Sequence, residues 1–287
     1  MKTIKIVRKT LRDGNIYPVV YNYLNLLPED ILHHNKHNLR HPLAIYNLSL
    51  NRVISAFIPI LDEIDKINTT LLDVSGKLNC DLSQLPKLQE ELLESLLAHI
   101  DDCYLILKTI HEPIESNSSS QFVEHWLKEA QHPGYKKFQT GIQIYRNSLA
   151  PLVNRIKHQH GRVRSFMIYP RDLTFVAYHK SSGFQFRPYK PRIPGYYIEG
   201  IQKDGKIGAD PELHPKNTAI SLNRDLKYHF VHIYSIGLDL KNALVESMRK
   251  LYGKELPLPG KIPTHSNSIS KIENLAERLS KRNRSRG

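Results

Sequence analysis

The sequence predicts a mainly α-helical protein, in which four long helices form a bundle and a small antiparallel β insertion separates the third helix from the fourth. Two observations predict this class. Apolar residues recur three and four positions apart over four long stretches, which is the spacing of one helix face. Between them, residues 165–222 carry short β-like runs separated by turn residues. Four helices with apolar stripes most simply pack as an up-and-down bundle.

The long helices are delimited by proline and glycine. The first begins at Pro42, a residue suited to the first helical turn, and is expected to kink at Pro59. The third is expected to kink or divide at Pro151, because proline removes an internal hydrogen bond. Short helices are expected at 120–131 and in the C-terminal tail at 269–279. The predicted bounds of the four long helices are 42–71, 87–112, 135–160 and 223–252.

These predicted elements divide the chain into five segments. They are an N-terminal arm with short strands at 1–41, the first part of the bundle at 42–164, the β insertion at 165–222, the fourth bundle helix at 223–253 and a basic tail with a short amphipathic helix at 254–287. The β-like runs of the arm are Thr3–Val7 and Tyr17–Tyr21. The clearest signal in the insertion is a hairpin over 197–208, whose turn contains Asp204-Gly205.

The charge is strongly positive and unevenly distributed. A formal charge of +13 and a pI near 9.6 favour a polyanionic partner, either nucleic acid or an anionic membrane surface. Residues 60–130 hold 14 acidic residues against 5 lysines, whereas residues 146–206 hold 12 basic residues against 3 acidic ones. The tail at 254–287 holds 8 basic residues against 3 glutamates. The basic part therefore either binds nucleic acid or meets the acidic part in a dimer.

Several protein classes have no support in the sequence. No apolar run reaches about 18 residues, so no transmembrane segment is expected. The N-terminus lacks the apolar core of a signal peptide, and the two cysteines have no metal-binding or disulfide pattern. We therefore expect a cytoplasmic protein without a cofactor or metal. P-loop, G-x-G-x-x-G, H-E-x-x-H and G-x-S-x-G motifs are all absent.

Two histidine groups have alternative interpretations. His33, His37 and His41, with Asp30, have a spacing that suits zinc, but no cysteine joins them and a solvated polar cap is the simpler interpretation. His229 and His232 on the fourth helix suit packed histidines with satisfied hydrogen bonds, although they also lie where they could complete a site.

The most informative stretch is Asn154–Arg164, at the end of the third helix. It contains Arg155, Lys157, His158 and His160, followed by Gly161 as the expected residue after the helix end. Cations at this position complement the negative end of the helix dipole, which gives a purely structural interpretation. Histidine and arginine near one helix end also suit phosphate chemistry.

The motif R-x-x-x-x-H from Arg155 to His160, on the third helix of a four-helix bundle, resembles that of the HEPN family (higher eukaryotes and prokaryotes nucleotide-binding). The string Asn154-x-x-Lys157-His158 is similar to a variant in uncharacterised bacterial HEPN-like proteins. The resemblance implies a homodimer that cleaves RNA without metal, as in toxin–antitoxin, phage-defence and CRISPR systems. It also implies an antitoxin or defence protein as partner.

On this reading, His160 is the general acid or base and Arg155 stabilises the charge on the phosphorane, because only histidine titrates near working pH and arginine clamps phosphate. Asn154, Lys157 and His158 share one helix face and would support the RNA backbone. Arg155 and His160 diverge on a regular helix, so they must act where the helix unwinds or across a dimer.

The β insertion interleaves basic and aromatic residues. This composition suits stacking on single-stranded bases, and it equally suits an ordinary sheet with one solvent-exposed face. The predicted nucleic-acid-binding residues are Arg162, Arg164, Arg171, Arg187, Lys190 and Arg192. The aromatic residues among them are Tyr169, Tyr178, Phe186, Tyr189, Tyr196 and Tyr197. Two functions stay open: an RNA-binding protein that acts as a metal-independent endoribonuclease, and a non-enzymatic dimerising module that binds nucleic acid or a protein.

Overall fold

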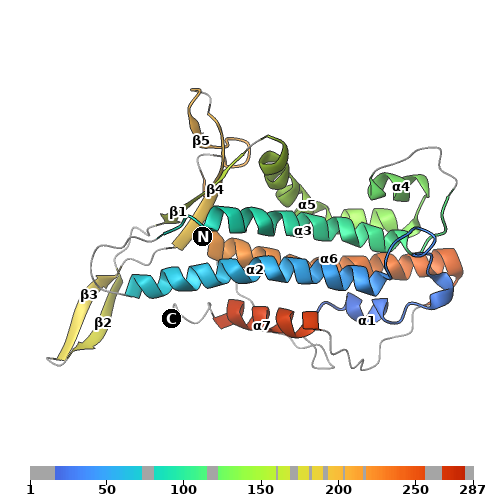
Figure 1. Ribbon diagram of the computed structural model, residues 1–287, viewed down its shortest axis with the longest axis horizontal. Helices are drawn as coiled ribbons and strands as arrows, with labels where there is room; N and C mark the ends of the chain where they lie inside the picture. The colour runs from blue at the N-terminus through green and yellow to red at the C-terminus, as the bar shows by residue number, and fades with distance from the viewer. Residues whose placement is uncertain are drawn as a thin grey trace. The chain divides into compact units, whose positions relative to one another are not determined.

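The structure of the chain is a computed structural model. It describes residues 17–72, 81–114, 122–159, 161–168, 174–180, 183–189, 193–202, 204–215, 218–255 and 267–281. Over these residues the protein is mainly helical, with seven α-helices and a small antiparallel β part between α5 and α6, so the prediction of a mainly α-helical protein with a small β insertion is confirmed (Figure 1).

The chain forms two compact units, each built from separate segments. Unit 1 comprises Met1–Pro59, Glu91–Val153 and Lys227–Gly287, and unit 2 comprises Ile60–Glu90 and Asn154–Leu226. Each of the four long helices contributes to both units.

The four long helices have nearly the predicted bounds. Neither Pro59 nor Pro151 interrupts its helix, so the third predicted helix is not divided. The second ends before Pro113, as expected. The helices are α2 (Pro42–Leu72), α3 (Leu85–Lys108), α5 (Pro133–His158) and α6 (Leu222–Tyr252).

Aromatic contacts join these four helices in a closed cycle within unit 1. The rings pair between α2 and α3, α3 and α5, α5 and α6, and α6 and α2, through Tyr46–His99, Tyr104–Phe138, Tyr145–His229 and Phe230–Phe57. Their apolar stripes are fully buried at positions such as Leu50, Leu96 and Leu149. Burial of these stripes is the main favourable term in the stability of such a core.

Helix α2 also passes a test of length and composition for a membrane span over Pro42–Ile67, with a mean hydropathy of 1.3. Of the window that passes, 44% is buried inside the protein. A core helix passes the same test, and Leu50, Val53 and Phe57 are fully buried. The result is weak evidence for a membrane segment.

Three shorter helices complete the helical part. They are α1 (Val20–Leu24), α4 (Val123–Glu129) and α7 (Asn267–Lys281), which is the predicted tail helix and buries Ile269, Ile272 and Leu279. The strand predicted at Tyr17–Tyr21 is wrong, because this stretch forms a turn and the start of α1. Its valine and tyrosine side chains favour strands, but all five residues of α1 are buried in a helix, and tertiary packing overrides such propensities. The other predicted strand, Thr3–Val7, lies outside the described residues.

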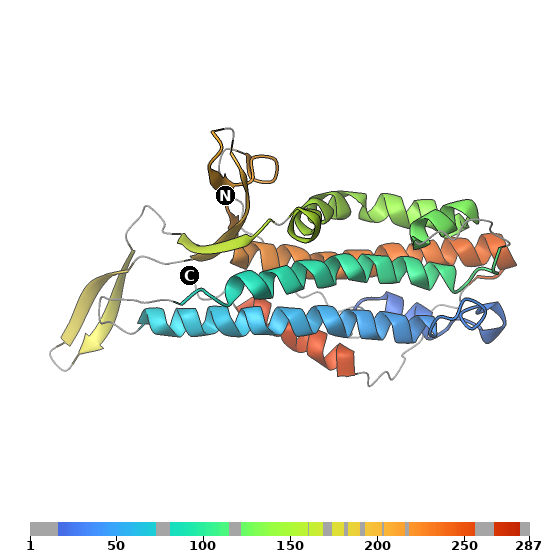
Figure 2. The ribbon, with the colours of Figure 1, turned by 45° about the horizontal axis from the view of Figure 1, so that its top comes forward.

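The described β part of unit 2 contains two sheets. In the larger, β1 (Val163–Ile168) and β4 (Ile193–Ile201) pair antiparallel, and β5 (Ile207–Ala209) and β6 (Ile220–Ser221) pair with β4 (Figure 2). The other consists of β2 (Thr174–Lys180) and β3 (Gly183–Tyr189). The predicted hairpin is confirmed as β4–β5, and Gly205 in its turn adopts a φ of +79°, which favours glycine.

Strand β4 has one buried and one open face. Tyr196 and Ile198 are fully buried, and Ile198 lies opposite Val163 of β1, which is also buried. Because successive side chains of a strand point to opposite faces, Tyr197 and Glu199 lie on the other face. This face adjoins the predicted functional segment.

Candidate nucleic-acid interface at the end of helix α5

The predicted motif occupies the last turns of α5 and the link to β1. Asn154, Lys157 and His158 are exposed, whereas Arg155 is partly buried. His160 lies outside the described residues, so its position relative to Arg155 is not described. The sequence prediction that Asn154, Lys157 and His158 share a helix face agrees with their common exposure on α5.

Gly161 is needed here for close packing. Its N–H donates to the carbonyl oxygen of Arg155 at 2.9 Å, which satisfies a carbonyl at the helix end. A Cβ added at Gly161 would lie 2.7 Å from Cγ of Arg155 and 3.0 Å from Cγ2 of Ile198.

The Arg155 guanidinium is held by acidic residues. Its Nε lies 2.8 Å from Oδ2 of Asp210 and its Nη2 lies 2.7 Å from Oε2 of Glu212. Nη1 donates to the side-chain oxygen of Gln159. The two acids differ in exposure, because the side chain of Asp210 is 3% exposed and that of Glu212 is 80% exposed. Arg155 therefore has one buried and one replaceable anionic partner.

Asp210 also organises the loop after β5. Its Oδ1 accepts the backbone N–H groups of Glu212 at 2.9 Å and of Leu213 at 3.2 Å, while its own N–H donates to the carbonyl of Ile198. One turn later, Nε2 of His214 accepts the N–H of Ile198 at 2.9 Å, and burial lowers the pKa of this histidine. Asp210 thus connects Arg155 of α5 to β4 and to its own loop.

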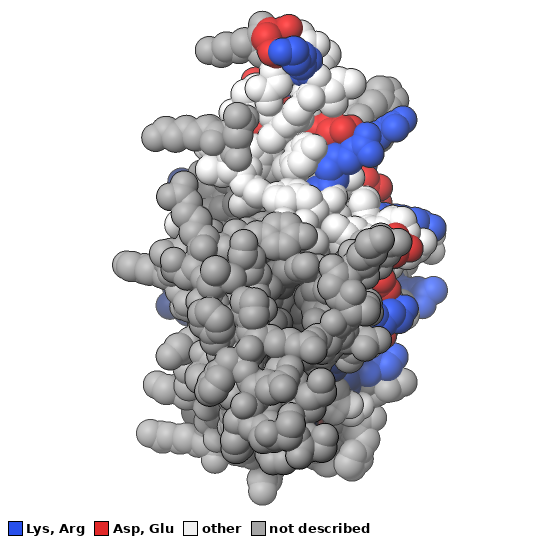
Figure 3. Space-filling view, turned by 90° about the vertical axis from the view of Figure 1, so that its left-hand side faces the viewer, with Lys and Arg blue, Asp and Glu red and all other residues white. Residues whose placement is uncertain are grey.

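A groove of about 660 Å³ opens beside this ion pair. The charged residues that line it are Arg155, Arg162, Arg164, Glu199, Asp210 and Glu212. Three positive and three negative side chains balance there. Nε of Arg164 lies 2.5 Å from Oε1 of Glu199, and this hydrogen bond raises the pKa of Arg164. On the described part of the surface in Figure 3, Lys and Arg likewise lie mixed with Asp and Glu.

The other predicted binding residues lie farther along the insertion. Arg187 is on β3, where it pairs with Val176 of β2. Arg171, Lys190 and Arg192 lie outside the described residues, as does Tyr169. Three of the predicted aromatic residues, Tyr178, Phe186 and Tyr189, are on β2 and β3.

Tyr196 and Tyr197 have opposite environments. Tyr196 is fully buried and donates a hydrogen bond to Oδ2 of Asp225 at 3.0 Å, so of the two alternatives for this residue the structure favours a place in an ordinary sheet over stacking on bases. Gln89 donates to the same oxygen. Tyr197 is partly exposed on the open face of β4.

The histidines near the N-terminus form packing contacts. Nε2 of His33 lies 3.1 Å from the Tyr252 hydroxyl, and Nε2 of His37 lies 2.8 Å from the carbonyl oxygen of His111. Burial lowers the pKa values of His33, His37 and His41. Within the described ranges, no group of three or more ligating residues could hold a metal ion. The predicted solvated cap is wrong for His33, which is buried.

The two α6 histidines are packed against α5. Nδ1 of His229 lies 2.9 Å from the Tyr145 hydroxyl, and the His232 ring stacks on Tyr145 at 4.3 Å. Nδ1 of His232 donates to the carbonyl oxygen of Tyr228. These contacts confirm the interpretation of packed, hydrogen-bonded histidines.

Sequence reasoning missed the acidic partners of Arg155 and the ring of Phe166. Asp210 and Glu212 flank Pro211, far along the sequence from Arg155. Their pairing with Arg155 is a long-range contact, which local patterns do not encode.

Comparison with known proteins gives no further guidance, because no family model, curated protein or solved structure matches the chain.

Proposed function

We propose that the chain is a HEPN-like RNA-binding protein, which holds RNA along the end of α5 and the start of β1. One observation carries this proposal. Lys157 and His158 at the end of α5, Arg162 in the link and Arg164 at the start of β1 are all exposed. Basic side chains of this kind contact phosphates without reading sequence. The four long helices and the motif around Arg155 support the HEPN-like assignment.

The state of Arg155 favours binding over cleavage as the first function. Asp210 and Glu212 occupy the guanidinium that would clamp a phosphate. Metal-independent endoribonuclease activity is the second candidate, and the exposure of Glu212 favours it. An RNA phosphate can replace an exposed carboxylate on Nη2 while the buried ion pair to Asp210 keeps Arg155 in place. In this mechanism His160 transfers the proton, and a homodimer supplies a second copy of both residues.

The binding proposal is tested with the double variant Lys157→Ala/Arg162→Ala. We expect its affinity for a labelled single-stranded RNA to fall about tenfold at low salt. The slope of the logarithm of the binding constant against the logarithm of the salt concentration should become shallower by about 1.4, because each phosphate contact contributes about 0.7 on single strands. The matched control is Lys128→Ala/Lys136→Ala, which removes two exposed lysines from unit 1. Equal affinities for the two double variants would contradict the proposal.

Cleavage is measured on the same RNA in EDTA. Products that end in 2′,3′-cyclic phosphate and disappear in both Arg155→Ala and His160→Ala would establish the nuclease. Intact RNA with salt-sensitive binding would assign the chain to the non-enzymatic class. Thermal unfolding of Arg155→Ala is needed beside the assay, since this residue also makes a buried ion pair.

A further inference from the structure

The open face of the sheet in unit 2 carries two aromatic rings side by side. In the ladder between β1 and β4, Phe166 lies opposite Gly195 and Arg164 lies opposite Tyr197. The rings of Phe166 and Tyr197 are therefore diagonal neighbours, with centroids 5.8 Å apart and planes inclined by 49°. Gly195 has no side chain to fill the space beside Phe166. Both rings are partly exposed.

These rings are not needed to fill the core. The core of the same strands lies on the opposite face, where Tyr196, Ile198 and Val163 are buried. A cross-strand aromatic pair contributes to the stability of a sheet, but such a contribution does not require an adjoining cavity. The ring of His214, which is itself buried, meets Tyr197 edge-on at 6.4 Å and fixes the orientation of the tyrosine.

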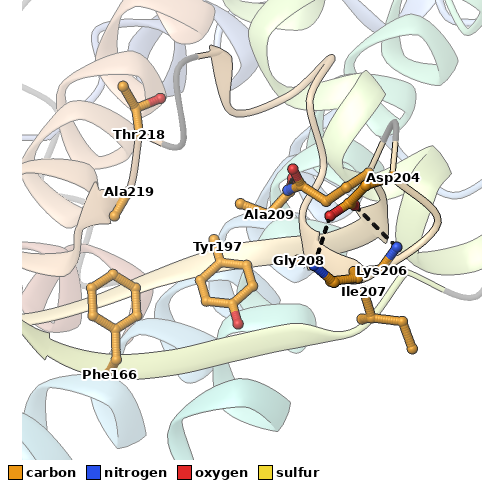
Figure 4. Close-up of a pocket in the computed structure, with 10 residues that line it drawn as sticks. Phe166, Tyr197, Asp204, Lys206, Ile207, Gly208, Ala209, Thr218 and Ala219 are labelled. Atoms are coloured by element: carbon orange, nitrogen blue, oxygen red, sulfur yellow. Dashed lines mark hydrogen bonds and ion pairs between the residues drawn. The ribbon is translucent and has the colours of Figure 1, made fainter.

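The two rings line an open pocket of about 480 Å³. This volume lies within the range of roughly 300–1,000 Å³ that small-molecule sites occupy. Figure 4 shows Phe166 at the left with Ala219 and Thr218 above it, Tyr197 in the middle, and the β5 hairpin with Asp204 and Lys206 at the right.

The rim of the pocket is polar and carries one cation, Lys206, while a second cation, Arg164, lies beside the pocket. Nζ of Lys206 lies 3.1 Å from Oδ2 of Asp204, and both side chains are largely exposed. The Gln202 amide donates to the carbonyl oxygen of Ala209 and fixes the hairpin wall. On the other side of Tyr197, the guanidinium of Arg164 is about half exposed, at 51%. Aromatic rings with cations beside them match a nucleotide, which has a flat base and an anionic phosphate.

We infer that this pocket binds one base of a single-stranded RNA, stacked against Tyr197 and Phe166, with the adjoining phosphates near Arg164 and Lys206. The inference rests on the proposed RNA-binding function and extends it from the helix end to the sheet. Arg164 lines the groove at the helix end and lies opposite Tyr197 in the ladder, so one strand passes from the link after α5 onto the open face of β1 and β4. Stacking tolerates every base, so little sequence preference follows from these two rings.

The test uses the full chain and two labelled oligonucleotides of about eight nucleotides, a site size typical of such proteins. One is an oligouridylate, and the other has the same phosphates with abasic riboses. We expect Tyr197→Leu to bind the oligouridylate about tenfold more weakly, the loss typical of one stacked base. The same variant is expected to bind the abasic strand as the wild type does. Leucine keeps apolar volume on the strand, so the sheet is retained.

Two control variants accompany it. Tyr197→Phe keeps the ring and is expected to bind both strands like the wild type. Phe122→Leu removes a ring that is 66% exposed in unit 1 and is expected to have no effect on either strand. A second measurement needs no variant: an oligonucleotide with thiouridine, cross-linked to the wild-type protein by light, is expected to label the peptides that contain Phe166 or Tyr197.

The outcomes separate the two proposals. Unchanged oligouridylate affinity in Tyr197→Leu, or cross-links only at other peptides, would overturn the base pocket while leaving RNA binding intact. A loss in Tyr197→Leu together with no effect of Lys157→Ala/Arg162→Ala would support the pocket and overturn the helix-end surface. A wild-type protein that binds neither strand would overturn both.

Discussion

Arg155 and Asp210 form an ion pair whose Nε–Oδ2 distance is 2.8 Å, and it joins the last turn of α5 to the loop that follows β5. The carboxylate is 3% exposed and also accepts two backbone N–H groups through Oδ1. A buried carboxylate with this many donors is well compensated, but removal of one partner leaves the other charge unpaired. The arginine to which we assign a role in the proposed RNA cleavage therefore also has a structural role.

Loss of Asp210 is expected to destabilise the protein strongly. Asp210→Ala leaves Arg155 without its buried partner and removes the acceptor of two loop N–H groups, so we expect the free energy of unfolding to fall by about 3 kcal/mol. Glu212→Ala is the matched control, because its carboxylate is 80% exposed and such pairs contribute about 0–1 kcal/mol. Urea unfolding of both variants measures the difference. Equal losses would contradict a structural role for the buried pair.

Neutralising Glu212 is expected to strengthen RNA binding. Glu212→Gln removes one of the three carboxylates in the groove and releases Nη2 of Arg155, so we expect affinity for single-stranded RNA to rise about threefold at low salt. The gain should shrink as salt is added, because the effect is electrostatic. Fluorescence anisotropy gives both quantities. Glu255→Gln removes an exposed carboxylate from unit 1 and is expected to leave the affinity unchanged; a gain as large in this control would show a general charge effect.

Local pattern was sufficient to predict most of the helices and strands. The apolar spacing from Pro42 onward and from Leu226 onward gave α2 and α6 within a few residues, because each buries a continuous stripe. The β4–β5 hairpin was predictable because Asp-Gly, here Asp204-Gly205, is typical of a tight turn between two strands. The strand predicted at Tyr17–Tyr21 failed because its β-branched and aromatic residues pack as a helix.

The candidate site was predictable only in part. Alternation along β4 predicts that Tyr196 and Tyr197 point to opposite faces, but not which face is buried. The face of Tyr196 is the buried one, because Asp225 accepts the hydrogen bond of its hydroxyl and Val163 of β1 lies opposite Ile198 on the same face. The pairing of Arg155 with Asp210 is likewise a property of the folded chain, since nothing near Arg155 in the sequence supplies a carboxylate.

Gly134 is expected to tolerate no side chain, because α5 approaches α6 closely there. A Cβ at this position would lie 2.6 Å from the carbonyl oxygen of Ala243 and would overlap Oγ of Ser247. We expect Gly134→Ala to lower the free energy of unfolding by about 1–3 kcal/mol, as for other overpacked contacts.

Gly141 on the same helix provides the comparison. The three atoms nearest its added Cβ belong to the side chain of Asp239, which can rotate, and alanine gains up to about 1 kcal/mol of helix propensity over glycine. Thermal unfolding should therefore place Gly141→Ala near the wild type or above it. A similar loss in both variants would indicate that helix approach at Gly134 is not the cause.

Burial of His132 is expected to make the protein sensitive to acid. The ring is 3% exposed, and burial, with the neighbouring His111, lowers its pKa to about 3. In the unfolded chain a histidine titrates near pH 6.5. Between these two pH values the unfolded state binds a proton that the folded state does not. The stabilisation linked to His132 is therefore fully present above about pH 6.5, and the free energy of unfolding declines as the pH falls toward 3. At about pH 5 the loss from this one group is about 2 kcal/mol.

His132→Asn separates this titration from packing. Nδ1 of His132 accepts the N–H of Gly134 at 3.2 Å, and the asparagine oxygen can accept the same N–H without titrating. Between about pH 7 and pH 5, the free energy of unfolding is expected to fall in both proteins. We expect the fall to be smaller in the variant than in the wild type, by about 2 kcal/mol. Urea unfolding at both values measures this difference. His125→Asn, at an exposed position of α4, is expected to keep the wild-type pH dependence. An unchanged dependence in His132→Asn would mean that the acid sensitivity arises from other buried groups, such as His99, whose pKa burial lowers to about 4.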